Sequence, residues 1–130
     1  MLHDMLSKYL NSIEVYVRKL DKVYVERYEE EIITNTRVNL RIRIRFMTGS
    51  LLEINEAVVA KSDSIIHLNY RYHFQDGNNN LVFRYDNAPH FPKFVNFPNH
   101  RHGPDDVSDA SKPSIEEIIE EAVFTEKKLK

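Results

Sequence analysis

The side chains that could carry out chemistry are concentrated between Tyr70 and His102, where a tyrosine-rich pair of strands precedes a loop interrupted by prolines. Imidazoles exchange protons near neutral pH, and guanidinium groups bind phosphate oxygens. This mixture is typical of a phosphate or nucleic-acid site. The candidate catalytic residues are His73, Arg84, Asp86, His90, His100 and His102, and the candidate substrate-binding residues are Tyr70, Arg71, Tyr72, Tyr85 and Arg43.

The strands on either side of an Asp-Gly-Asn-Asn turn set the expected geometry of these groups. If Gln75 pairs with Asn80, the aromatic residues face the core and Arg71 lies opposite Arg84 on the other face. Like charges in that position are destabilising. Either a bound phosphate or the Asp86 carboxylate is therefore expected to neutralise them.

His73 shares the face of the two arginines and is a candidate for proton transfer. An imidazole there could exchange a proton while the guanidinium groups hold a pentavalent phosphate, as in metal-independent RNA cleavage. The alternative is an ordinary surface histidine whose hydrogen bonds are satisfied.

Segment 87–112 contains four prolines and no periodicity, which predicts a functional or a disordered loop. The prolines could stiffen the backbone and deliver His90, His100 or His102 to the sheet beside His73; otherwise these histidines only cap backbone groups. The phenylalanines of the loop are expected to pin it to the domain rather than to stack on bases. His100 and His102 could clamp a metal, but no third ligand stands at a fixed spacing, so we expect neither metal nor cofactor.

A strand predicted to end at Phe46 alternates apolar residues with Arg37, Asn39, Arg41, Arg43 and Arg45. Side chains two apart share a face, so the arginines could follow a phosphate backbone. Glutamates on neighbouring strands can pair with them, and a solvated lattice of salt bridges is favoured. A three-residue turn over 48–50 would set Phe46 against Leu52 and Arg45 against Glu53.

Hydrophobic periodicity predicts the elements that position these groups. Apolar residues at three- and four-residue spacing predict a helix over 2–20, and period-two patterns predict an antiparallel sheet over 22–86. The loop rich in proline and histidine occupies 87–112, and a capping box of Ser114 and Glu117 begins a helix over 113–128. We expect an α+β fold with about five strands, in one domain over 1–130.

Composition narrows the class of protein. A net charge of −2 and a pI near 6.3 argue against nucleic-acid binding through an overall positive field, although a local basic patch is compatible with them. The absence of cysteine excludes disulfides, thiolate catalysis and thiolate zinc sites. The N-terminus mixes apolar and charged residues, which predicts neither a signal peptide nor a membrane span. We expect a cytoplasmic protein.

The ordered motifs YRYHFQD, LVFRYDNAPH and FPNHRH, followed by a PSIEEIIEEA helix, resemble the TumE family of small prokaryotic toxins. The resemblance extends from the arginine-rich strand onward. It implies a toxin that is encoded beside a helix-turn-helix antitoxin, is held inactive by this partner and acts on RNA; a homodimer is left open. The matching positions are Tyr70, Tyr72, His73, Arg84, Tyr85, Asp86, Pro89, His90, Pro98, His100 and His102.

The leading hypothesis is a metal-independent endoribonuclease in which His73 and one of the three loop histidines act as base and acid. One alternative is a binding toxin that blocks its target by occupancy, without turnover. A second is a metal-dependent nuclease that uses Asp86, His100 and His102.

Overall fold

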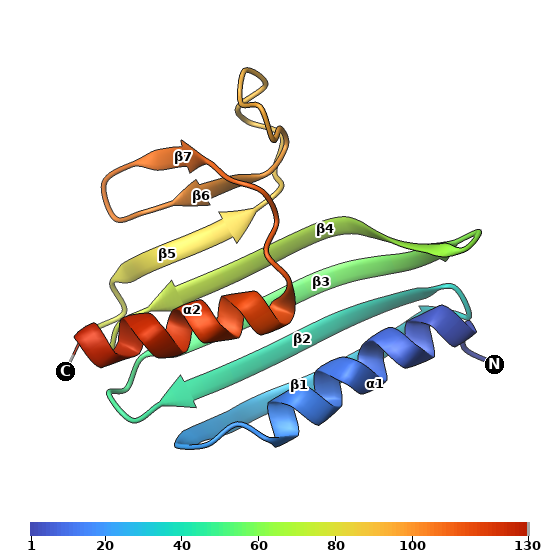
Figure 1. The fold of residues 1–130 in the computed structure, drawn as a ribbon, viewed down its shortest axis with the longest axis horizontal. Helices are drawn as coiled ribbons and strands as arrows, with labels where there is room; N and C mark the ends of the chain where they lie inside the picture. The colour runs from blue at the N-terminus through green and yellow to red at the C-terminus, as the bar shows by residue number, and fades with distance from the viewer. Residues whose placement is uncertain (130) are drawn as a thin grey trace.

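A computed structural model describes residues 1–129; only Lys130, the last residue of the predicted domain, lies outside the described residues. Within these residues, two helices and seven strands follow one another (Figure 1). They are α1 (Asp4–Arg18), β1 (Val23–Thr34), β2 (Arg37–Phe46), β3 (Leu51–Lys61), β4 (Ser64–Gln75), β5 (Leu81–Asp86), β6 (His100–His102), β7 (Val107–Asp109) and α2 (Ile115–Lys128).

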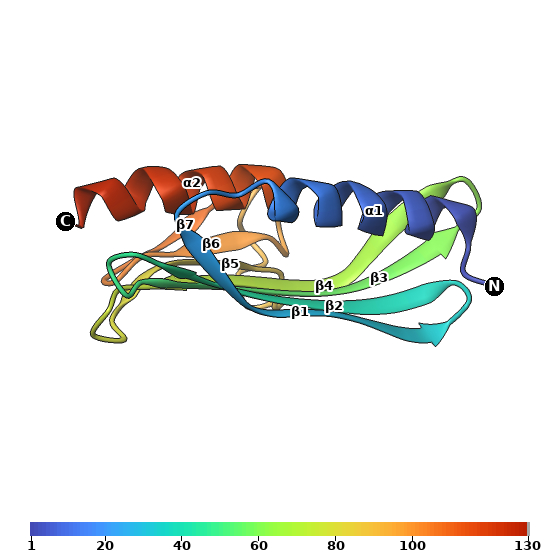
Figure 2. The same cartoon turned by 90° about the horizontal axis from the view of Figure 1, so that it is seen from below.

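The strands form a single antiparallel sheet in the order of the sequence, and both helices cover the same face of it (Figure 2). The expected α+β fold is confirmed. The expected number of strands was too small, because segment 87–112 contains β6 and β7. Strands of three residues are too short for a period of two to be recognised.

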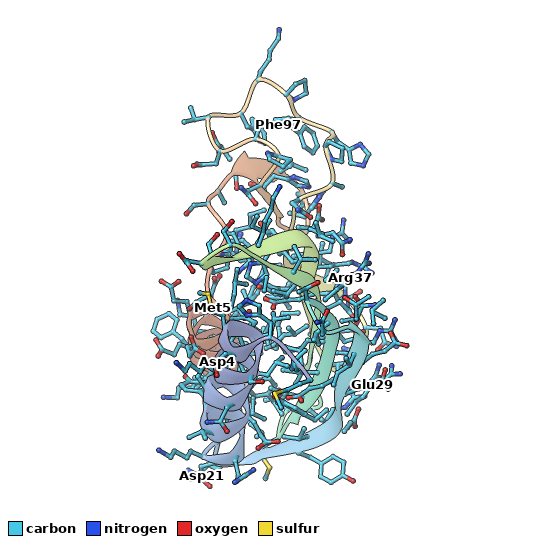
Figure 3. The ribbon with its side chains drawn as sticks, turned by 90° about the vertical axis from the view of Figure 1, so that its right-hand side faces the viewer. Asp4, Met5, Asp21, Glu29, Arg37 and Phe97 are labelled. Carbon is cyan, nitrogen blue, oxygen red and sulfur yellow. The ribbon has the colours of Figure 1, made fainter. Side chains whose placement is uncertain are left out.

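The core lies between the sheet and the helices. Leu6, Leu10, Ile13 and Val17 form the buried stripe of α1, and every second residue of β2 is buried beneath it. The predicted capping box of Ser114 and Glu117 is present at the start of α2. The other face of the sheet carries polar side chains, and Figure 3 shows Glu29 and Arg37 on the side away from α1.

The β2–β3 hairpin has the predicted faces but a different register. Arg43 pairs with Glu53, and Ile44 pairs with Leu52. The turn closes with Phe46 donating its N–H to the carbonyl of Ser50, so the pairing is shifted by two residues from the expected one. A shift of two keeps every side chain on its predicted face, which is why the alternation alone did not distinguish the two registers.

A buried carboxylate ties α1 to the sheet. Glu56 of β3 accepts a hydrogen bond from the Tyr9 hydroxyl of α1 at 2.5 Å and another from the Tyr72 hydroxyl of β4. His67 Nε2 lies 3.2 Å from the same carboxylate, and Lys112 Nζ lies 3.9 Å from it. Burial opposes ionisation, but the bonds from these partners hold the pKa of Glu56 below its usual value.

Among the described residues, neither helix has the length and the apolar composition that a membrane crossing requires.

Candidate functional site

The candidate residues come together on the face of the sheet that the helices leave open. Cross-strand pairing sets Arg71 of β4 beside Asp86 of β5, and Asp86 beside His100 of β6. The neighbouring row runs from His73 through Arg84 to His102. We call the six residues of these two rows the site face: Arg71, His73, Arg84, Asp86, His100 and His102.

The expected pairing of Arg71 with Arg84 is wrong. The turn pairs Gln75 with Leu81 instead of Asn80, and Val82 is an extra residue in β5. Together the wider turn and this bulge shift the register by two residues, so that Arg71 faces Asp86 and His73 faces Arg84. Arg84 Nε donates to Asp86 Oδ2 at 3.2 Å. Of the two alternatives left open by the sequence, the carboxylate therefore neutralises Arg84. Arg71 is exposed and takes part in no ion pair with the described residues.

Asp86 is the centre of the site face. Its Oδ1 atom accepts the N–H of Ala88 at 3.0 Å and lies 2.9 Å from His100 Nε2, and its Oδ2 atom lies 3.6 Å from His102 Nε2. His100 also approaches the carbonyl oxygen of Pro98 with Nδ1, at 3.0 Å. The His100 side chain is only 1% exposed, which places it out of reach of a substrate.

Burial and nearby arginines lower the pKa values of two histidines of the site face. Burial lowers the pKa of His73, and the positive charges of Arg71 and Arg84 lower it further. Burial likewise lowers the pKa of His102, again helped by Arg84, although Asp86 opposes the shift. Both imidazoles are therefore biased toward the neutral form. His73 Nε2 is bonded to the Gln75 side chain at 3.0 Å, and its buried Nδ1 has no partner among the described residues.

The loop after β5 projects beyond the sheet, with Phe97 near its tip (Figure 3). Phe91 stacks on Phe94 at 5.1 Å and meets the His100 ring edge-on at 4.9 Å. Phe91 therefore contacts strand β6 as the expected pinning role requires, whereas the contact of Phe94 is with Phe91 inside the loop. Phe97, in contrast, is 41% exposed.

Two polar residues of the loop region were missed by the sequence reasoning. Asp109 of β7 accepts the backbone N–H groups of Val95 and Asn96 at 2.6 and 3.1 Å. Asn99 accepts the Tyr70 hydroxyl at 2.8 Å. Nothing in the spacing of these residues distinguishes them from other polar residues of a loop, so the sequence held no signal for their roles.

An open pocket of about 540 Å³ lies where this loop leaves the site face. Arg71, Arg84, Asp86, His90 and His102 line it together with the backbone that follows β5. The pocket thus offers two guanidinium groups, two imidazoles and one carboxylate to a single ligand. His73 lies across Arg84 from His102, on the same face but outside the pocket lining.

The three candidate tyrosines do not belong to this surface as substrate contacts. Tyr72 is fully buried under the helices, and Tyr85 donates its hydroxyl to Glu121 of α2 at 2.7 Å. Tyr70 borders the pocket, but its side chain is 4% exposed and its hydroxyl is taken by Asn99. Alternation along each strand points these rings toward the core, so we withdraw them as ligand-binding groups.

The arginines of β2 form the favoured salt-bridge lattice. Arg41 pairs with Glu29 at 3.1 Å, and Arg43 bridges Glu26 and Glu53 at 2.8 and 3.2 Å. Arg45 pairs with Glu26 at 3.1 Å instead of with Glu53, as the shifted register requires. Arg43 is thus held by two carboxylates and lies outside the pocket lining, which leaves it unsuited to the substrate-binding role expected of it.

Comparison with known proteins gives one match. The family model described as toxin TumE matches residues 13–127, which is most of the chain and includes every residue of the site face. Neither the curated proteins nor the solved structures give a match.

Proposed function

The chain belongs to the TumE toxin family, and from that premise we propose that it is an RNA-cleaving toxin that acts at the site face. Family membership makes it the toxin component of a toxin–antitoxin pair and implies an antitoxin partner. The reaction, the RNA target and the helix-turn-helix class of the antitoxin are our proposals.

The observation that carries the proposal is the pocket in which Arg71 and Arg84 stand beside His90 and His102. Guanidinium groups match the geometry and charge of a phosphodiester, and Arg71 forms no ion pair within residues 1–129 that would have to be displaced first. The negative formal charge of the whole chain means that such a local patch, not an overall field, would have to attract RNA.

His73 and His90 are the imidazoles left for proton transfer, because His100 and His102 both face Asp86. His73 Nε2 would exchange its bond to the Gln75 side chain for the substrate hydroxyl. In the proposed reaction the neutral His73 accepts the proton of a ribose 2′-hydroxyl, and the 2′-oxygen attacks phosphorus. The 5′-oxygen leaves with a proton from His90, and a 2′,3′-cyclic phosphate remains. Arg71 and Arg84 stabilise the added negative charge on the phosphate.

The test uses purified chain, released from its antitoxin, with total cellular RNA as the substrate. We expect fragments with cyclic phosphate ends, and a loss of about 100-fold or more in rate for His73→Ala or His90→Ala. Arg71→Gln should also slow cleavage. Arg41→Gln is the matched control, because Arg41 is an arginine of the same sheet already committed to Glu29, and it should cleave at the wild-type rate.

Intact RNA after incubation with a preparation that is toxic in cells would contradict the proposal. If toxicity also survives both histidine substitutions, the toxin acts by occupying its target. Growth of cells that express each variant from an inducible promoter distinguishes this outcome from cleavage.

A further inference from the structure

We propose that Asp86, His100 and His102 form a binding site for one divalent transition-metal ion of the zinc class. The sequence named these three residues only as an alternative, without a fixed spacing for the carboxylate, and the pairing of β5 with β6 brings them together. One ligand atom from each of the three residues lies within 4.8 Å of the other two. Two imidazoles and one carboxylate are a common ligand set for such ions.

The strongest support is the arrangement of the buried His100 ring. Its Nδ1 atom lies 3.0 Å from the Pro98 carbonyl oxygen, which can only accept, so Nδ1 carries the hydrogen. In the neutral ring Nε2 then holds a lone pair. Nε2 is 2.9 Å from Asp86 Oδ1, yet the angle does not fit a hydrogen bond and Nε2 has no partner among the described residues.

A lone pair beside a carboxylate oxygen at this distance is repulsive unless a cation lies between them. Protonation of Nε2 would make an ion pair, but the N–H would not point at the oxygen. A metal ion satisfies both atoms. With metal–ligand bonds of about 2.1 Å, the 2.9 Å from His100 Nε2 to Asp86 Oδ1 corresponds to an angle of about 90° at the ion. His102 Nε2 lies 3.6 Å from the other carboxylate oxygen, so its side chain would have to move closer to Oδ1 to bind the same ion.

The surroundings of the three residues also resemble those of a metal site. Metal-bound histidines usually donate their second N–H to a carbonyl or carboxylate, as His100 does toward Pro98. The Asp86 carboxylate is oriented by the N–H of Ala88 and by Arg84 Nε, and the Phe91 ring shields His100 on one side. Arg84 is a competing cation, but it uses only one side of the carboxylate.

The remaining coordination positions would open toward the pocket, because Asp86 and His102 line it. These positions can take water or a phosphate oxygen. Mg²⁺ and Ca²⁺ prefer all-oxygen ligands and fit this set poorly. The inference goes beyond the proposed RNA cleavage, since metal binding can be measured without RNA.

The test is a titration of the full chain, first stripped of metal with a chelator. Co²⁺ is followed by its visible absorption, which reports imidazole and carboxylate ligation, and Zn²⁺ by calorimetry. We expect one ion per chain with micromolar or tighter affinity, and no binding of Mg²⁺ under the same conditions. His102→Ala should weaken binding by more than about 100-fold, since even the loss of an outer-shell partner costs 10- to 100-fold.

His102 is the variant of choice because its side chain is 20% exposed, whereas the buried His100 is more demanding to replace. His3→Ser is the matched control: it removes a histidine from the N-cap of α1, outside the site, keeps a capping oxygen there, and should bind as the wild type does. Circular dichroism establishes that each variant is folded.

Failure of the wild type to bind Co²⁺ or Zn²⁺, or equally tight binding by His102→Ala, would overturn the inference. The two proposals fail separately. RNA cleavage that persists in EDTA by a chain that binds no metal removes the metal site alone. One bound ion per chain without any cleavage of RNA removes the proposed reaction alone.

Discussion

Replacing Glu56 by glutamine should destabilise the protein, although the side chain keeps its shape. The substitution removes the charge of a carboxylate that is fully buried and bonded to several partners. Glu56 Oε1 accepts from Tyr9 at 2.5 Å and lies 3.2 Å from His67, and Oε2 accepts from Tyr72. Glutamine puts two N–H donors where one of these oxygens was, so one hydroxyl loses its acceptor. A hydrogen bond to a charged group contributes about 1.5–3 kcal/mol, and the remaining bonds weaken with the loss of charge.

We therefore expect Glu56→Gln to lower the free energy of unfolding by about 2–4 kcal/mol at pH 7. For a chain of this size the melting temperature should fall by roughly 10 °C. Urea unfolding followed by circular dichroism measures the first quantity, and calorimetry the second. Glu29→Gln, which changes an exposed carboxylate in the same way, should leave both unchanged within error.

The loss should depend on pH with a definite sign. The folded-state pKa of Glu56 is lowered from 4.5, so its ionisation stabilises the fold above that pH, and the contribution disappears as the pH falls through the folded-state pKa. The difference between wild type and Glu56→Gln should accordingly shrink below pH 4.5. A difference in unfolding free energy under about 0.5 kcal/mol at pH 7, or one that stays constant with pH, would refute the reasoning. That outcome is a real alternative, since apolar replacements in other proteins show that buried ionic groups are not always stabilising.

Three further predictions concern the site. If His73 is the base, the acidic limb of the pH–rate profile for RNA cleavage should lie below pH 6.5, because the pKa of His73 is lowered from that value; an acidic limb centred at or above pH 6.5 would argue against this role. The Asp109 carboxylate accepts the amide N–H groups of Val95 and Asn96, so Asp109→Ala should speed hydrogen exchange at these two amides. Unchanged exchange by NMR would mean that other contacts hold the loop. An acidic antitoxin segment bound at Arg71 should dissociate more readily as salt rises, so an affinity that is independent of salt in calorimetry would exclude such contact.

The sequence determined the elements and the faces of their side chains. The stripe of α1, the alternation in β2 and the capping box of Ser114 and Glu117 all appear as predicted. So does the outward orientation of Arg71, His73, Arg84 and Asp86. These features depend on neighbours within a few residues, which the periods of the helix and the strand report directly.

The register of the sheet was decided only by the tertiary structure. A shift of two residues between β2 and β3 leaves every face unchanged, so the alternation could not exclude it. The turn, which pairs Gln75 with Leu81, and the bulge at Val82 together reassigned the partners of Arg71 and His73, and they placed Asp86 instead of Arg84 opposite Arg71. Bulges and turn closure depend on cross-strand packing, which period-two patterns do not encode.

The site itself shows the same division. From the sequence, the candidate histidines and arginines could be named, but not which of them touch. The carboxylate beside His100 and His102 comes from β5, and β6 is too short to be recognised from periodicity. Phe91 meets the His100 ring edge-on, and Asp109 accepts a backbone N–H of the loop, although these residues all lie in one segment without periodicity. Contacts between residues far apart in sequence are set by the packed fold, so residue types alone gave the chemistry available, and the tertiary structure gave its geometry.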